Sequence, residues 1–328
     1  MKKGLAVVIM LLFLASCENA KDSFVATKSI GKVNTILVVI EGDYWKGKVG
    51  NELRSFLGEL LVGLPQPETT FTVSQVAPKG FSSITKKTHN ILFVEKSNKE
   101  GFTIKKDLYA APQTLISVTA KDEEGLINQL KKHSKEIVKT FKEKDIHFLQ
   151  GVFRAKKLDD SKYKTLKKLG LSLTIPEEFR EVDDTGDFLW LRQHLRSGIA
   201  KGDGTNNILV YSMPLLNEDE ISKNILSNRD TIGKKYIPGS KEGMYMITEA
   251  AYTPVTVEAI VANKKAFETR GKWEVKNDFM AGPFLNYTII DKKNNRLIVF
   301  EGFTYAPSIN KREFVFELEA IAKSLKIL

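Results

Sequence analysis

The chain has 328 residues, of which 42% are hydrophobic and 27% charged, and its formal net charge is +10. This composition is that of an ordinary globular protein long enough for two domains. The single cysteine excludes an intramolecular disulfide, a cysteine nucleophile and a thiolate metal site in the mature domain.

The first residues have the organisation of a cleaved signal peptide. Two lysines precede an apolar run over residues 5–14, about half of the roughly 20 residues that cross a bilayer. The run ends in Leu-Ala-Ser-Cys at residues 14–17, which resembles the lipobox of bacterial lipoproteins. We therefore predict that residues 1–16 are removed and that the thiol of Cys17 is lipidated, with acyl chains such as palmitate. An ordinary signal peptide with an incidental cysteine, or a buried core cysteine, is the alternative.

Residues 17–32 are predicted to be a lipidated tether, because the polar stretch after Cys17 has no clear period. A flexible tether of this length has a typical end separation of about 20 Å by random-coil scaling. We therefore expect a cell-envelope protein, anchored to the outer membrane in its periplasmic or its surface leaflet.

The basic charge is concentrated in one region. Many of the lysines fall between residues 131 and 168, interleaved with apolar residues at helical spacing. This pattern favours a solvated helix face over a binding patch. For an exported chain, lipid phosphates and acidic glycans are the expected acidic surroundings, and nucleic acid is not an expected partner.

Residues 33–169 are predicted to form an N-terminal α/β domain. The β-branched run 33–40 indicates a buried strand, and a helix with an apolar face over residues 45–60 follows it. A long helix, with a kink in its second half, begins at Asp122, and the lysine-rich region after it ends at a helix-capping Gly170. Further strands are expected at residues 70–76, 91–95 and 114–119.

Residues 170–328 are predicted to form a C-terminal α+β domain, an antiparallel sheet backed by helices. Short turns join its strands, as is typical of hairpins. Helices are expected at residues 219–236 and from Lys311 on, and the last has an apolar stripe that reaches Leu328. The arrangement resembles the Mog1/PsbP-like sandwich in fold only. The expected strands cover residues 171–175, 188–192, 208–213, 244–250, 256–262, 266–275, 284–290 and 297–304.

Familiar motifs for metals, cofactors and catalysis are absent. A G-x-S-x-G elbow, a Walker loop and a dinucleotide fingerprint are missing, so no cofactor is expected and catalytic residues stay unknown. Asp183, Asp184 and Asp187 surround Gly186, but the closing glutamate of an EF-hand is missing, so an acidic hairpin turn is favoured over a calcium site. The four histidines share no metal-ligand spacing: His89, His133, His147 and His194.

A recognition site is predicted in the C-terminal domain. Arginine offers a rigid fork for a carboxylate or phosphate, and tryptophan a flat platform for a sugar or a partner side chain. The alternative is structural: the arginines pair with aspartates to hold a helix on the sheet, and the tryptophan lies in the core. The candidate residues are Arg192, Arg229, Asp230, Arg270, Trp273 and Asp278.

Several short runs along the chain form a recognisable set. They are Leu-Pro-Gln-Pro-Glu at 64–68, Phe-Leu-Trp-Leu-Arg at 188–192, Arg-Asp at 229–230, Ile-Pro-Gly at 237–239, Arg-Gly-Lys-Trp at 270–273 and Asp-Phe-Met-Ala-Gly-Pro-Phe at 278–284. The set resembles a Bacteroidota cell-envelope lipoprotein family catalogued as a domain of unknown function, and it covers nearly all of the mature chain. The resemblance implies an envelope location and supplies no activity. At Ala281 and Gly282, where two glycines are expected before Pro283, the chain departs from the pattern.

Three functions remain open. The leading hypothesis is a non-catalytic binding or assembly module for an envelope protein or glycan, held to the membrane by its lipid. The rival is a hydrolase of envelope glycans that uses Asp or Glu, which requires two carboxyl groups about 5 to 9.5 Å apart in a cleft. A structural spacer would have no sizeable pocket. Convergence of the candidate residues on an open pocket favours binding, and their burial against each other favours a structural role.

Overall fold

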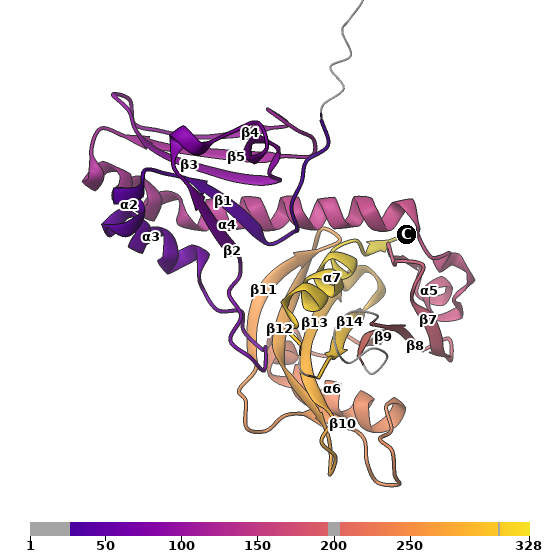
Figure 1. Ribbon diagram of the computed structural model, residues 1–328. Helices are drawn as coiled ribbons and strands as arrows, with labels where there is room; N and C mark the ends of the chain where they lie inside the picture. Colours follow the sequence, from indigo (N-terminus) through magenta and orange to yellow (C-terminus); the bar gives the residue numbers. More distant parts are fainter. Residues whose placement is uncertain (1–26, 196–203, 308) are drawn as a thin grey trace, which may run out of the picture.

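The computed structural model describes residues 27–195, 204–307 and 309–328, and the predicted lipid-attachment residue Cys17 lies outside them. A five-stranded sheet comes first along the chain, and an eight-stranded sheet follows it (Figure 1). The expected fold class, an α/β unit followed by an antiparallel sheet with helices, is confirmed. No helix within the described residues combines the length and the apolar character needed to cross a bilayer.

The first unit, residues 27–155, is built on the five-stranded sheet. Its strands are β1 (Thr35–Val39), β2 (Thr72–Val76), β3 (Asn90–Lys96), β4 (Gly101–Lys106) and β5 (Thr114–Ala120). Their order is β2-β1-β3-β5-β4, with parallel pairing except between β4 and β5. Central strands β1, β3 and β5 are largely buried, as parallel strands covered on both faces should be. The sequence does not predict β4, because this edge strand is mostly exposed.

Helices cover one face of this sheet and loops cover the other. The helices are α2 (Gly42–Lys46), α3 (Lys48–Leu57) and α4 (Glu123–Ala155), with short turns η1 (Pro78–Gly80) and η2 (Thr85–Lys87) in a loop. On the helical face, Leu53 of α3 and Phe141 of α4 pack in one core with Val38 of β1. On the opposite face, Phe81 and Tyr109 from loops close a smaller core.

Two expectations for these helices are wrong. The helix expected over residues 45–60 is split at Gly47 into α2 and α3 and ends at Leu57, and Leu60 is exposed. The helix after Asp122 has no interruption over its 33 residues, and the Asp122 carboxylate accepts the N–H of Gly125 at its start. The apolar pattern shifts along α4 because its first part packs in the core of the first unit and Phe153, near its end, packs in that of the second.

The second unit, the described part of residues 156–328, is built on the eight-stranded sheet. Its strands are β7 (Arg180–Asp184), β8 (Phe188–His194), β9 (Thr205–Pro214), β10 (Met246–Thr248), β11 (Val255–Val261), β12 (Lys264–Val275), β13 (Ala281–Asp291) and β14 (Arg296–Tyr305). The order is β10-β12-β13-β14-β9-β8-β7, with β11 also paired to β12, and neighbouring strands are antiparallel. The sequence misses β7, which is largely exposed at the sheet edge.

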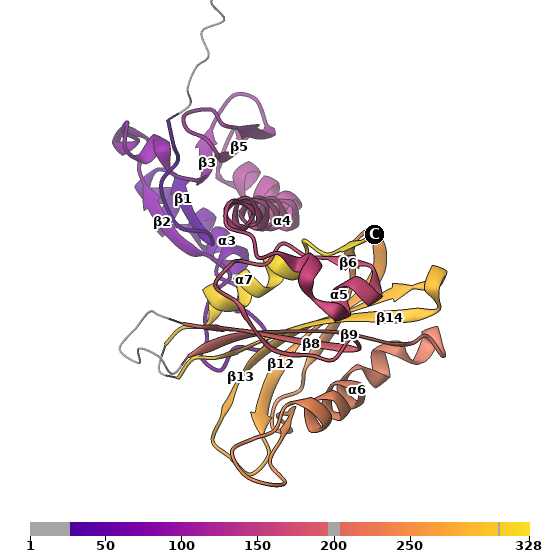
Figure 2. The ribbon, with the colours of Figure 1, turned by 90° about the vertical axis from the view of Figure 1, so that its right-hand side faces the viewer.

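Helices lie on both faces of the second sheet (Figure 2). They are α5 (Lys164–Leu169), α6 (Ile221–Tyr236) and α7 (Arg312–Ala322), with turns η3 (Asp160–Lys162), η4 (Glu218–Glu220) and η5 (Lys292–Asn294). Helices α5 and α7 share one core, and α6 covers the opposite face. Residues Leu158, Tyr163, Leu166 and Leu169 pack in the same core as α7.

The last helix is shorter than its apolar stripe predicts. Helix α7 ends at Ala322, and Leu328 is 85% exposed. The chain instead closes a small two-stranded sheet, in which β15 (Lys326–Ile327) pairs with β6 (Leu171–Ser172).

The acidic residues of the β7–β8 hairpin serve helix α5. Asp184 accepts the backbone N–H groups of Lys164 at 2.6 Å and Thr165 at 2.9 Å, at the start of that helix. Asp187 forms an ion pair with Lys168, at 2.7 Å, near the end of the same helix. Asp184 therefore complements the N-terminus of α5, and Asp187 pairs with a lysine in the last turn of the helix.

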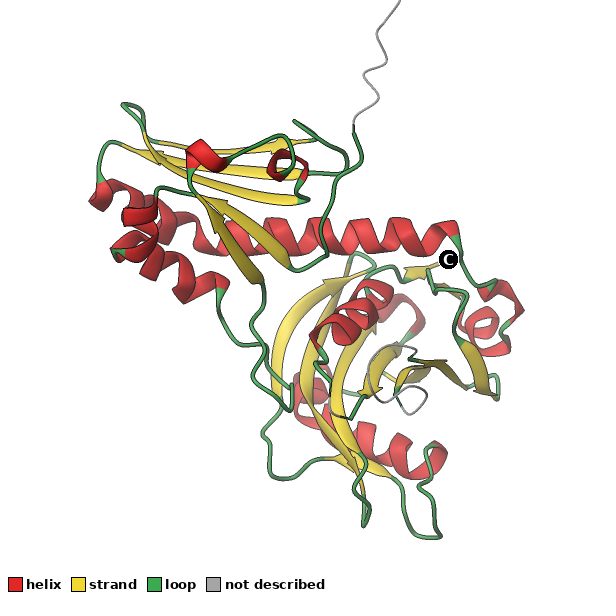
Figure 3. Cartoon of the chain, in the orientation of Figure 1, coloured by secondary structure: helices red, strands yellow, loops and turns green. Residues whose placement is uncertain are grey.

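The two units meet where α4 passes α7 (Figure 3). Glu68, from the first unit, accepts the N–H of Lys311 at 2.7 Å and that of Arg312 at 3.1 Å. These are the first amides of α7, which has no side-chain cap of its own. The buried Glu319 of α7 also lies 2.9 Å from the ammonium group of Lys142 on α4. One unit therefore completes the hydrogen bonding of a helix in the other.

Candidate functional site: a basic pocket beside a buried histidine–aspartate pair

The predicted recognition residues do not converge on one site. Arg229 on α6 is 1% exposed, and its Nε lies 3.0 Å from Oε1 of Glu301 on β14. Its guanidinium lies 4.0 Å from the ring of Phe284, in the core beneath α6. The adjacent Asp230 lies 3.4 Å from Nη1 of Arg229 and accepts the backbone N–H of Thr248. This group ties α6 to the sheet.

Arg270 on β12 pairs on the opposite face of the same sheet. Its Nε lies 2.6 Å from Glu268, and its Nη2 lies 2.6 Å from Glu319 of α7. Trp273, on the same strand, is 2% exposed and packs in the core beneath α6. Its indole N–H donates to the carbonyl oxygen of Thr304. The two arginines are therefore separated by the sheet.

The remaining two candidates lie apart from these groups. The guanidinium of Arg192 lies 4.7 Å from the ring centroid of Trp190, and its Nε donates to Asn207. Asp278 lies in the turn after β12, where its carboxylate accepts the N–H of Phe279. Arg229 and Trp273 are buried and Arg270 is partly buried. Both arginines pair with carboxylates, but Arg270 pairs with two glutamates and not with an aspartate.

A hollow of about 520 Å³ opens in the first unit, where the second half of α4 passes the sheet. Strands β3 and β5 begin there with Asn90 and Thr114, and β4 ends there with Lys106. Phe148 and Val152 of α4 make one side apolar. We call this hollow the basic pocket; its lining consists of Lys28, His89, Lys106, Asp107, Pro112, Gln113, Thr114, Lys144, His147, Phe148, Gly151 and Val152.

Three lysines, Lys28, Lys106 and Lys144, make the pocket electropositive. The Asp107 carboxylate in the lining already accepts the backbone N–H of Gln113 at 2.8 Å. Burial lowers the pKa of Lys144, and the neighbouring charge of Lys106 lowers it further. Two ammonium groups therefore repel each other at the pocket, and an anion placed between them would relieve that repulsion.

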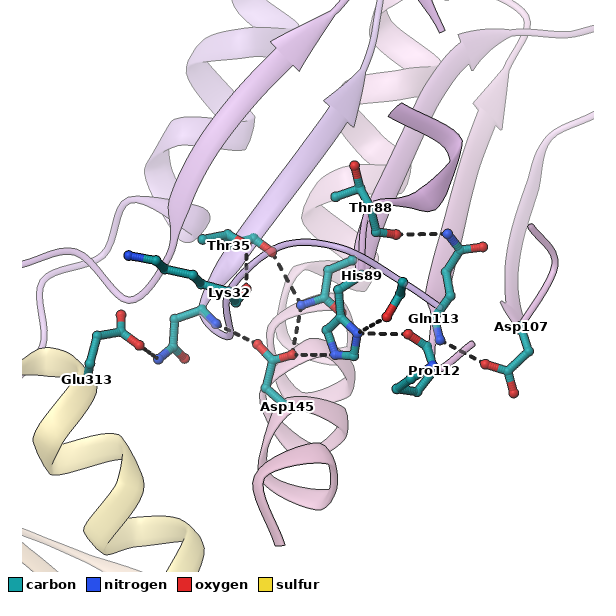
Figure 4. A network of polar contacts seen from close by, with 12 residues as sticks. Lys32, Thr35, Thr88, His89, Asp107, Pro112, Gln113, Asp145 and Glu313 are labelled. Carbon is teal, nitrogen blue, oxygen red and sulfur yellow. Dashed lines mark hydrogen bonds and ion pairs between the residues drawn. The ribbon is translucent and has the colours of Figure 1, made fainter. Parts of the chain in front are cut away.

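A buried histidine–aspartate pair lies behind the pocket (Figure 4). His89 is 4% exposed and Asp145 is fully buried, and Nε2 of the ring lies 3.1 Å from Oδ1 of the carboxylate. The other ring nitrogen, Nδ1, lies 2.8 Å from the carbonyl oxygen of Pro112 and 3.4 Å from the hydroxyl of Ser29. A carbonyl oxygen only accepts, so Nδ1 carries a proton. Nε2 then faces the carboxylate favourably only with a second proton between them.

Asp145 also accepts hydrogen bonds from two amides. Its Oδ2 accepts the backbone N–H of Asn34 at 2.7 Å, and its Oδ1 accepts an amide N–H of Asn90 at 2.9 Å. Both carboxylate oxygens therefore have N–H donors in addition to the facing imidazole. The side chain of Asn34 also donates to Glu313 of α7 at 3.3 Å, so the network reaches the second unit.

The N-terminal arm, residues 27–31, contributes Lys28 to the lining of the pocket. Backbone bridges join Lys28 to Ala111 and Ile30 to Thr88. The arm is therefore held against the loops that precede β3 and β5, and Lys28 is held at the pocket. The lining supplies ammonium groups, imidazoles and apolar carbons, a set that suits an anionic ligand better than covalent catalysis.

Sequence reasoning misses this site because its residues come from separate segments of the chain. The available signal is Asp145, which follows Phe141 by four residues on the apolar face of α4. A carboxylate on such a face needs a partner when it is buried. His89 is that partner, although spacing along the sequence gives no indication of it.

A second hollow, of about 610 Å³, lies beside α7 in the second unit and has both Glu178 and Glu317 in its lining. Burial raises the pKa of Glu317 to about 7, with Glu313 and Glu178 adding to the effect. Arg180, also in the lining, donates from Nη1 to the carbonyl of Phe179. A carboxyl group that titrates near neutrality beside another carboxyl group suits acid–base chemistry.

The comparisons with known proteins cover both units. The family model of the domain of unknown function DUF4837 matches residues 157–324, and that of the domain of unknown function DUF8532 matches residues 29–154. No curated protein sequence matches the chain significantly.

Several solved structures are distantly similar to about half of the chain. The Ran-binding protein Mog1p of Saccharomyces cerevisiae has 8% identity and a TM-score of 0.32, with 48% of this chain and 90% of that chain covered. LpqN of Mycobacterium tuberculosis, described as involved in cell envelope biogenesis, has 11% identity and a TM-score of 0.29, with 48% and 82% covered. A Bacteroides thetaiotaomicron protein has 11% identity and a TM-score of 0.26, with 48% and 45% covered. Likenesses this distant carry no functional argument.

Proposed function

We propose a function that is based on the residues of the chain itself. The chain belongs to the DUF4837 family of domains of unknown function. It is a cell-envelope protein anchored by lipid on Cys17, and it is a non-catalytic module that binds an anionic ligand in the basic pocket. The observation that carries the binding proposal is the meeting of Lys28, Lys106 and Lys144 around one hollow.

The anchor is supported by the sequence around Cys17, which combines a short apolar run with the Leu-Ala-Ser-Cys ending. Mass spectrometry of the full chain expressed in a lipoprotein-processing bacterium tests it. We expect a mature chain that begins at Cys17 and carries the mass of acyl groups. An unmodified thiol, or a Cys17→Ser variant with the same membrane association, would contradict the anchor.

The binding proposal is tested by calorimetric titration of the full-length Cys17→Ser chain with inorganic pyrophosphate. We expect saturable binding that is lost in Lys106→Ala/Lys144→Ala, because both ammonium groups contact the anion. The matched control, Lys139→Ala/Lys223→Ala, removes two lysines whose side chains are 73% and 67% exposed elsewhere on the surface. Equal loss in both double variants, or no saturable heat with the parent chain, would refute the pocket as the anion site.

A second candidate, a hydrolase of envelope glycans, has support from Glu178 and Glu317 in the second hollow. Glu317 is a carboxyl group that holds its proton near neutrality, and Glu178 is a second carboxyl group in the same lining. Incubation of the parent chain and Glu317→Gln with purified envelope glycans tests it. New reducing ends that depend on Glu317 would favour the hydrolase, and their absence would leave the binding module as the better account.

A further inference from the structure

Each segment that supplies a lysine to the basic pocket also supplies an exposed apolar side chain. Ile30 on the arm is 47% exposed, Leu108 after β4 is 42% exposed, and Val152 on α4 is 51% exposed. Val152 lines the pocket and Leu108 follows a lining residue. The carbonyl of Ile30 accepts the N–H of His89, which is also in the lining. Ammonium groups beside exposed aliphatic side chains are typical of surfaces that lie at the headgroup level of a bilayer.

The charges of the pocket suit a phosphate group. Lys106 and Lys144 repel each other, so a phosphate between them gains attraction and removes repulsion at the same time. Lys28 adds a third ammonium group from the arm, and the imidazole of His89 is also in the lining. We call the exposed side chains of Ile30, Leu108 and Val152 the apolar rim. A small soluble anion does not need this rim, whereas an anion that is attached to hydrocarbon can contact it.

The arm also lies close in the sequence to the predicted anchor residue. Lys28 follows Cys17 by eleven residues. Such a segment reaches at most about 40 Å when extended and typically about 18 Å as a random coil. A headgroup in the bilayer that holds the anchor therefore lies within reach of the pocket.

We infer that the basic pocket binds the phosphate headgroup of an anionic phospholipid in the membrane that carries the anchor. The inference rests on the proposed function, since it names the anion that the pocket binds. The phosphate lies between Lys106 and Lys144, and the side chains of Ile30, Leu108 and Val152 enter the headgroup region. The first unit then rests on the membrane, and the second unit is held away from it.

Vesicle sedimentation of the full-length Cys17→Ser chain tests the inference without a contribution from acyl chains. Phosphatidylcholine vesicles are compared with vesicles that also contain phosphatidylglycerol, at equal ionic strength. We expect binding to the anionic vesicles only, and a loss of roughly 30-fold in Lys106→Ala/Lys144→Ala, given the attraction of each lysine to an anionic surface. Leu108→Ser should weaken vesicle binding and leave pyrophosphate binding unchanged, because Leu108 is 42% exposed and lies outside the pocket lining.

The control Lys139→Ala/Lys223→Ala removes the same charge and should bind anionic vesicles like the parent chain. An equal loss in this control would show diffuse attraction and overturn the inference. Saturable pyrophosphate binding without a preference for anionic vesicles would also overturn it, while the proposed anion-binding function would stand. Absence of both kinds of binding would refute the proposed function itself. Matching melting curves for all variants exclude misfolding as the cause.

Discussion

Arg229 on α6 and Glu301 on β14 face each other within the second unit, with Nε 3.0 Å from Oε1 and each side chain only 1% exposed. Burial raises the pKa of Glu301, and the charge of Arg229 acts in the opposite direction. The guanidinium also lies over the ring of Phe284. The arginine that the sequence offers for recognition is therefore buried, and its contacts attach α6 to the sheet.

Arg229→Met is expected to lower the free energy of unfolding by about 3 to 5 kcal/mol, because it leaves a buried carboxylate without its partner. Urea denaturation of the full chain at neutral pH measures the loss. The double variant Arg229→Met/Glu301→Leu should recover most of it, since no unpaired charge remains. A double variant as unstable as the single one would mean that the loss of stability comes from altered packing and not from an unpaired charge.

Glu317→Gln is expected to stabilise the chain at pH 8 and to leave it unchanged at pH 4. The folded-state pKa of about 7 lies above the ordinary value of 4.5, so the native state holds this proton more tightly than the unfolded chain. Stability contributed by the protonated form is present below pH 4.5 and is lost as the pH rises to about 7. The stabilisation at pH 8 is at most about 3 kcal/mol. Thermal unfolding across this range checks it, and a constant difference between parent and variant would contradict it.

Nitrogen NMR of the imidazole should show a proton on each ring nitrogen of His89, because each faces an acceptor. The reason is geometric: one nitrogen faces a carbonyl oxygen at 2.8 Å and the other faces the Asp145 carboxylate at 3.1 Å. In Asp145→Asn the ring should lose one proton, and the chain should lose roughly 2 to 4 kcal/mol as the contacts of two asparagines are disturbed. His194, which is exposed, serves as the internal reference. A neutral ring in the parent chain would refute the ion pair.

Gly282→Ala is expected to destabilise the chain by several kcal/mol, on the order of a severe overpacking change. A methyl group there would lie 2.0 Å from the carbonyl oxygen of Thr304, whereas the preceding Ala281 is exposed. Of the two positions before Pro283, the second is therefore the one that requires glycine.

The matched control is Gly151→Ala on α4, where the nearest atom to the new methyl group is a guanidinium nitrogen of Arg154 at 3.8 Å. An alanine at this exposed helical position should stabilise the chain by about 0.5 to 1 kcal/mol. Chemical denaturation of both variants measures the contrast. Similar effects at the two positions would contradict the close backbone approach at Gly282.

Local patterns predict much of the fold and little of the site. Strand β14 is evident from its continuous apolar run, because it is buried along nearly its whole length, and β12 is evident from its alternation. Asp122 is evident because aspartate is a favoured N-cap before an apolar helical pattern. Strands β4 and β7 escape prediction because exposed edges impose no such pattern. The end of α7 escapes because Leu325 is buried after the helix has finished, so an apolar residue there does not report helix length.

The site escapes for a different reason. The strand order and the path of α4 bring together Lys28, His89, Lys106 and Lys144. The spacing of residues along the sequence indicates neither the strand order nor the path of this helix. The predicted recognition residues show the opposite situation, in which residues that are close in the sequence are separated in space. Arg270 and Trp273 are close along β12, but their side chains lie on opposite faces of the sheet.

The carboxylate of Glu68 has a consequence for the order of assembly. It accepts the first amides of α7, which lies 243 residues later in the chain. During synthesis or export the early segment emerges long before the helix that it completes, so the C-terminal helix can dock as the last step, onto a partner already in place. A fragment that begins after α4 would lack this docking point, and its final helix would fray from the start.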